Sequence, residues 1–158
     1  MDDYLLVGPQ SKLEHLTEDM AATMLLRDVQ LLEQGKPPVK FLGWMLSRVA
    51  EGFTLAVNPQ LIDDIIADSG MAASTRGGAA AGLKERVMDE TPLDAEEHSL
   101  YTTQVGRLLF LSALRPDLQN AVGQLSRHVA RPTFFDCVSL KRCVRFLMCT
   151  RGMVVNLL

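Results

Sequence analysis

A chain of 158 residues, 47% of them hydrophobic, is long enough to bury one substantial core or two small ones, and no run approaches the roughly 20 apolar residues of a membrane span. The acidic N-terminus lacks the positive charge of a signal peptide, and three cysteines without paired ligand spacing indicate free thiols in a reducing compartment. We therefore expect an intracellular protein, in cytoplasm or nucleus, with no membrane partner.

The net charge of −3 is divided unevenly along the chain. Residues 1–103 carry 8 Lys/Arg against 17 Asp/Glu, a net of −9, whereas residues 104–158 carry 8 against 2, a net of +6. Such polarity predicts that the C-terminal part faces a polyanion, although a merely solvated basic face would give the same counts.

The chain opens with two adjacent carboxylates, Asp2 and Asp3, directly before a predicted strand over residues 4–7. Paired carboxylates at a backbone bend are hard oxygen ligands suited to Mg²⁺, although a solvated chain end has the same appearance. A capping box at Ser11 and Glu14 then predicts a helix to about Leu26. The apolar stripe of this helix is Leu13, Leu16, Met20 and Met24.

Strand-like segments follow this helix. Residues 29–33 form a short one, and residues 39–49 form a longer one that contains the string Phe41, Leu42, Gly43 and Trp44. A turn at Glu51 and Gly52 leads into a strand over 53–57, which predicts a hairpin. Asn58 as a cap and Pro59 at the first helical position predict another helix, which Gly70 ends.

An Ala/Gly-rich stretch over residues 72–91 has the composition of a linker, after which Pro92 and Asp94 open a helical part. Two apolar stripes separated by Arg115-Pro116 predict a helix hairpin. The stripes are Val105, Leu108, Leu109 and Ser112, then Leu118, Val122, Leu125 and Val129.

A third helix is predicted from about Thr133 to Cys149, followed by an apolar strand over 152–158. Helical spacing groups Lys141, Arg142 and Arg145 on one face and turns Phe134, Val138 and Leu147 inward. Arg127 and Arg131, four residues apart, form a second basic patch. From spacing alone, these cations are the best candidates for phosphate contacts.

Three landmarks in this order resemble copia-type retrotransposon reverse transcriptases. Met1-Asp2-Asp3 resembles the end of the aromatic-X-Asp-Asp turn of the palm, and Phe41-Leu42-Gly43-Trp44 resembles the strand near the primer-grip hairpin. Residues 104–147 resemble the thumb and the helices that follow it. The likeness covers nearly the whole chain and is densest over 101–147.

The resemblance implies roles for individual residues. Asp2 and Asp3 would be palm carboxylates, catalytic and metal-binding, with Mg²⁺ as the cofactor of the parent enzyme. Phe41, Leu42, Gly43 and Trp44 would lie near the primer terminus. Gly106, Arg107 and Phe110 would track the minor groove of a template–primer duplex, where Gly106 would permit close backbone approach, although tight helix packing would also explain a glycine there. The implied nucleic-acid contacts are Gly106, Arg107, Phe110, Arg127, Arg131, Lys141, Arg142 and Arg145.

The resemblance also implies a fold and a domain organisation. We expect an α+β chain: part of a palm with a primer-grip-like hairpin over 1–71, a linker over 72–92 and a helical thumb-like region over 93–158. The partners would be an RNA template, an RNA–DNA or DNA duplex, and the remainder of a Pol polyprotein.

The chain departs from the pattern of these enzymes. It lacks the fingers, the motif's aromatic residue and the earlier palm strand with another metal-binding aspartate, and Asp136 stands where relatives often have histidine. Two-metal nucleotidyl transfer needs carboxylates from separate strands. The leading interpretation is therefore a fragment of an RNA-directed DNA polymerase that is inactive by itself. The alternatives are a non-catalytic nucleic-acid-binding remnant that uses the basic helices, or a decayed reading frame.

Overall fold

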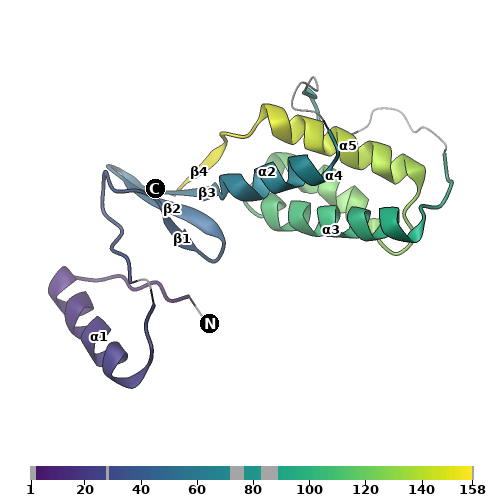
Figure 1. Ribbon diagram of the computed structural model, residues 1–158. Helices are drawn as coiled ribbons and strands as arrows, with labels where there is room; N and C mark the ends of the chain where they lie inside the picture. The colour runs from purple at the N-terminus through teal and green to yellow at the C-terminus, as the bar shows by residue number, and fades with distance from the viewer. Residues whose placement is uncertain (1–2, 28, 72–76, 83–88, 158) are drawn as a thin grey trace. The chain divides into compact units, whose positions relative to one another are not determined.

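A computed structural model describes residues 3–27, 29–71, 77–82 and 89–157 (Figure 1). The chain divides into two compact units, Met1–Leu55 with Asn156–Leu158, and Ala56–Val155. Five helices and four strands in the described residues confirm the predicted α+β class. In these residues no helix is both long and apolar enough to cross a bilayer.

The strands β1 (Val39–Phe41), β2 (Trp44–Val49), β3 (Gly52–Val57) and β4 (Val154–Leu157) form one sheet in the order β1-β2-β3-β4. The predicted strands over 53–57 and 152–158 are thus confirmed, but the single strand expected over 39–49 is wrong. The chain reverses at Leu42 and Gly43, which have φ values of 48° and 84°, and Phe41 pairs with Trp44. Two positive φ values are what a type I′ hairpin turn requires.

The helix of the first unit, α1 (Gln10–Thr23), begins after Pro9 without a side-chain cap, so the capping box expected at Ser11 and Glu14 does not form. No residue of α1 is buried, and Leu16 and Met24 of its predicted stripe are exposed. The strands predicted over 4–7 and 29–33 are wrong. Neither segment joins the sheet, and the nearest pairing is an isolated bridge between Gln34 and Arg48 of β2.

The second unit contains the helices α2 (Pro59–Asp68), α3 (Ala95–Ser112), α4 (Pro116–Arg127) and α5 (Phe134–Cys149). Figure 1 shows them gathered into one bundle, in which α3 packs against the other three. Each helix begins where the sequence predicts. The Asn58 side chain caps α2, Asp94 and Glu97 form a capping box on α3, and Pro116 opens α4.

The core of this bundle follows the two predicted stripes closely. Nine buried residues come from α3 and α4: Tyr101, Gln104, Val105, Leu108, Leu111, Ser112, Leu118, Val122 and Leu125. The buried Tyr101 hydroxyl donates to the Leu125 carbonyl at 2.8 Å, which ties α3 to α4. Two predicted core residues are wrong, because Leu109 and Phe134 lie at the surface. The amide of Gln104, 2% exposed, has no hydrogen-bond partner among the described residues.

Two described parts of the Ala/Gly-rich stretch pack on α5. Gly78 N–H donates to the Arg145 carbonyl at 3.2 Å, and a Cβ on Gly77 would overlap Cys149 Sγ. Residues 89–93 run against residues 132–135, with Leu93 N–H donating to the Pro132 carbonyl. The close approach of residue 77 to the helix therefore favours a glycine there. The domain boundaries near 71 and 92 stay a prediction.

Candidate nucleic-acid interface

Ion pairs divide the basic residues of 104–158 into two groups. Arg107 Nη1 lies 2.5 Å from Asp68 Oδ2 on α2, and Arg151 pairs with Asp63 on the same helix. Arg115 pairs with Asp117 and is buried. These three arginines are already neutralised within the bundle, so the predicted phosphate contact at Arg107 would have to displace Asp68.

The other five cations have no acidic partner within salt-bridge distance among the described residues. They are Arg127, Arg131, Lys141, Arg142 and Arg145. All are exposed except the half-buried Arg142. The structure thus leaves unpaired the cations of the two patches that spacing predicts, and it places three of them on one helix.

Lys141 and Arg145 of α5 are exposed to solvent and, four residues apart, lie in one row on the same face of the helix. Its opposite side is buried, with Leu140, Cys143, Val144 and Leu147 all in the core. Because the buried side anchors the helix, the cations are held at fixed spacing, about 6 Å apart along the axis for a separation of four residues. The Gly78 N–H donates to the Arg145 carbonyl, and a Cβ on Gly78 would lie 3.5 Å from Arg145 Cβ, so the segment 77–78 borders the C-terminal end of this row.

Acidic residues near the second basic patch, Arg127 and Arg131, make its electrostatic potential less favourable for binding phosphate. The segment 89–93 pairs with residues 132–135 and carries Asp89 and Glu90. Arg127 also makes a 3.4 Å hydrogen bond to Gln124. Carboxylates near a cation weaken its attraction for a polyanion. The row on α5 is therefore the stronger phosphate candidate of the two patches.

A buried carboxylate organises the turn between α4 and α5. Asp136 is 3% exposed and accepts hydrogen bonds from His128 Nδ1 at 2.6 Å, and from the Thr133 N–H and hydroxyl at 2.8 Å each. Burial alone would raise the pKa of Asp136, but these hydrogen bonds outweigh it and hold that pKa below its ordinary value. Sequence reasoning missed this cluster, although Thr133 and Asp136 have the spacing of a capping box.

The predicted groove-tracking residues of α3 lie on its outer face. Gly106 is exposed, and a Cβ there would meet nothing within 4 Å, so tight packing does not explain this glycine. Phe110 is exposed on the same side of the helix. The structure therefore leaves room for a partner above Gly106, while Arg107 beside it is held by Asp68.

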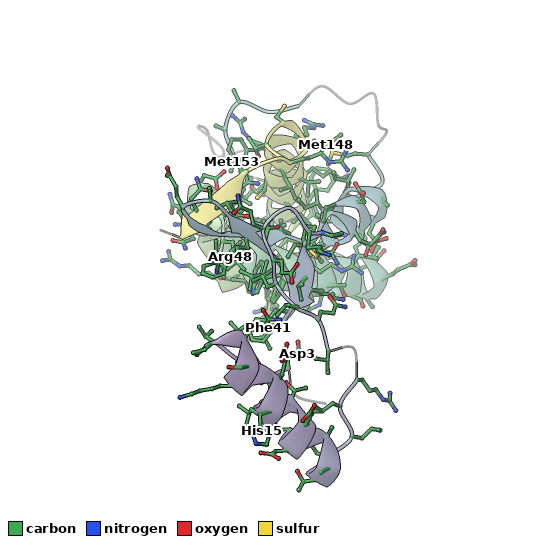
Figure 2. All side chains as sticks on the ribbon, turned by 90° about the vertical axis from the view of Figure 1, so that its left-hand side faces the viewer. Asp3, His15, Phe41, Arg48, Met148 and Met153 are labelled. Carbon is green, nitrogen blue, oxygen red and sulfur yellow. The ribbon has the colours of Figure 1, made fainter. Side chains whose placement is uncertain are left out.

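In the first unit, one hydrogen bond brings together two of the predicted site elements. Asp3 Oδ2 accepts the Leu42 N–H at 2.9 Å, and Figure 2 shows Asp3 near Phe41. Leu42 has a positive φ that is uncommon for a branched side chain, and the carboxylate stabilises the turn in which it lies. Asp2 lies outside the described residues. Trp44 closes the same turn as the partner of Phe41.

The described residues do not supply the ligands of a two-metal centre. They contain no group of three or more His, Cys, Asp or Glu side chains able to hold a metal ion. Asp3 offers one carboxylate, of which one oxygen is already engaged by Leu42. Asp2, the second predicted ligand, lies outside the described residues, so Mg²⁺ as the cofactor stays a prediction and we derive no chemical step through it.

Two of the three cysteines, Cys137 and Cys143, are weak nucleophiles. All three are free thiols, as their spacing predicts. Burial raises the pKa of Cys143 to about 12, and burial followed by the charge of Glu97 raises that of Cys137. Both thiols are therefore protonated and unreactive near neutral pH.

Comparison with known proteins gives two relatives of one kind. The chain is 25% identical over 148 residues to the retrovirus-related Pol polyprotein from transposon RE2 of Arabidopsis thaliana, and 26% identical over 148 residues to that from transposon RE1 of the same plant. Each alignment covers 93% of this chain but 10% of the relative. No protein-family model and no solved structure matches the chain. These likenesses support an origin in a retrotransposon Pol polyprotein.

Proposed function

We propose that this chain is a nucleic-acid-binding segment of a retrotransposon-type Pol polyprotein, and that α5 supplies its main phosphate contacts. One observation supports this most strongly: internal ion pairs neutralise Arg107, Arg115 and Arg151, while three cations of α5 stay without an acidic partner in the described part of the chain. These unpaired cations are held at fixed spacing on a helix whose other side is buried, which suits them to the regularly spaced charges of a nucleic-acid backbone.

The proposal predicts a steep salt dependence that depends on α5. Each phosphate contact releases condensed counterions, so the slope of log K against log salt is about −0.9 per contact on a duplex. Changing Lys141, Arg142 and Arg145 together to alanine should make the slope less negative by about 2.7 and weaken binding at least tenfold at low salt. The measurement is fluorescence anisotropy of a labelled RNA–DNA hybrid across a salt series.

A matched control removes the same charge elsewhere. Alanines at Lys12, Arg27 and Lys36, all exposed in the first unit, change the net charge equally and should leave the slope within about one unit of that of the parent chain. Equal losses in the two triple variants would show a diffuse charge effect and count against an interface on α5. Absence of saturable binding by the parent chain at low salt would contradict the proposal altogether.

A second candidate function follows from the contact between Asp3 and the turn at Leu42. From this contact we propose that residues 1–71 correspond to part of a polymerase palm and residues 93–158 to its thumb. The chemistry of the parent protein would be RNA-directed DNA polymerisation. The partners would then be an RNA template, the duplex product and the rest of the polyprotein. The hydrogen bond from Leu42 supports this, since it joins the carboxylate to the primer-grip-like string.

We expect the isolated 158 residues not to extend a primer, because the described residues contribute one carboxylate where nucleotidyl transfer needs several from separate strands. The measurement is extension of a labelled DNA primer on an RNA template with deoxynucleotides and Mg²⁺. An inactive chain that still binds the hybrid would support a binding role. Extension that is lost in an Asp3→Asn variant would show a working catalytic centre instead.

A further inference from the structure

One exposed row on α5 combines an aromatic ring with the unpaired cations. Phe134, Lys141 and Arg145 are separated by seven and four residues, which places them within about 40° of one another around a helix of 3.6 residues per turn. All three are exposed, and Phe134 is 50% exposed although the sequence predicts it inside. The ring lies about 10 Å from Lys141 along the helix axis.

The position of Phe134 is fixed by its backbone and not by its side chain. Its N–H donates to the Thr91 carbonyl at 2.9 Å, and the capping box of Thr133 and Asp136 sets the start of the helix directly before it. The ring is thus an exposed apolar surface on a rigid support. An exposed aromatic that no core requires is a candidate for contact with a partner.

The two ends of this row on α5 differ in charge. At the end near Phe134, the adjacent segment carries Asp89 and Glu90, and the Asp89 and Thr91 carbonyls occupy the first N–H groups of α5. This helix start is therefore not available to a phosphate. At the other end lie Lys141 and Arg145. A polyanionic strand would place its phosphates at the cations and a neutral group at the ring.

We propose that α5 binds single-stranded nucleic acid, or the single-stranded extension of a duplex, with an unpaired base stacked on Phe134 and the adjoining backbone on Lys141 and Arg145. A cationic track beside an aromatic platform is the arrangement by which proteins hold single strands without reading sequence. In a continuous duplex the base faces are covered by their neighbours, so only an unpaired base can reach the ring. This inference rests on the proposed function and adds the form of nucleic acid.

The test compares two labelled RNA–DNA hybrids, one blunt and one with a single-stranded RNA extension, in the parent chain and in Phe134→Ala. The variant should lose roughly tenfold in affinity for the extended hybrid, since stacking contributes about 1–3 kcal/mol per base, and should bind the blunt hybrid as the parent does. Its salt slope should stay unchanged. Replacing the extension by abasic sugar-phosphate should abolish the difference between parent and variant.

Two further variants separate stacking from apolar contact. Phe134→Trp keeps a planar ring and should retain affinity for the extended hybrid within about twofold, whereas Phe134→Leu keeps apolar bulk without a ring face and should behave as the alanine variant does. Because the side chain is exposed, all three should melt at the parent temperature. Equal affinity of Phe134→Ala and parent for the extended hybrid would overturn the inference, while an intact salt slope would leave the proposed function standing. Equal losses of affinity for the blunt and the extended hybrid in Phe134→Ala would also overturn the inference that a base stacks on Phe134.

Discussion

Replacing Arg115 by alanine is expected to lower the free energy of unfolding by about 3–5 kcal/mol. The guanidinium is 2% exposed and donates to both Asp117 oxygens, at 2.9 and 2.7 Å, and to the Thr150 carbonyl and hydroxyl at 2.9 and 2.6 Å. It thereby joins the α3–α4 turn to the end of α5. Truncation removes the partner of the Thr150 carbonyl and hydroxyl, exchanges the Asp117 ion pair for water and opens a cavity as large as the side chain.

Urea unfolding followed by circular dichroism measures this loss. The matched control is Arg107→Ala, because Arg107 also pairs with an aspartate but lies partly exposed, and it should cost less than about 1 kcal/mol. Similar losses in the two variants would contradict the role of burial. The hydrogen bond from Arg115 lowers the pKa of Asp117, so the stability from this pair is present above the unfolded pKa of the carboxyl and is lost as pH falls through the folded one.

The helical unit could be predicted well from the sequence because its signals are local. Apolar spacing of three and four residues defines the buried sides of α3 and α4, and Pro116 separates them. Asn58 with Pro59 gives the start of α2 in the same way. These signals act within one or two turns of helix, so no knowledge of distant residues is needed.

The first unit could not be predicted as well because its structure depends on backbone choices that residue type does not reveal. The turn inside 39–49 places Leu42 at a positive φ, which its side chain disfavours and which the Asp3 carboxylate helps to hold. Residues 4–7 have strand-like composition yet make no ladder. Strand propensity requires a neighbouring strand to have effect.

In the candidate site, too, local features could be predicted from the sequence and features that depend on long-range packing could not. The row of Lys141 and Arg145 follows from helical spacing alone. The pairing of Arg107 with Asp68 could not be foreseen, because the two residues are 39 apart in sequence and meet only through the packing of α2 on α3. The apolar character of Phe134 predicts an inward side chain, but its place at the first position of α5 leaves it on the outer row. Charge counts locate a basic region; packing decides which of its charges stay free.

Removing the Asp136 carboxylate is the second large expected effect, a loss of about 2–4 kcal/mol on Asp136→Ala from the cap and the buried hydrogen bonds together. The residue satisfies the Thr133 N–H and hydroxyl and binds the His128 imidazole at the junction of α4 with α5. The matched control is Asp94→Ala, which removes the exposed capping box of α3 and should cost only about 1 kcal/mol.

The pH dependence identifies the cause of that loss. Since the folded pKa of Asp136 is lowered, its contribution is fully present above the unfolded pKa, about 3.9 for an aspartate, and disappears as pH falls through the folded value. Denaturant midpoints measured from pH 7 down to pH 3 should therefore fall more steeply in the parent chain than in Asp136→Asn, which cannot ionise. If the midpoints of the two proteins fell equally with pH, the charge of the Asp136 carboxylate would not contribute to stability. A steeper parent curve would show that the ionised carboxylate holds the start of α5, and with it the spacing of Phe134, Lys141 and Arg145 on the proposed interface.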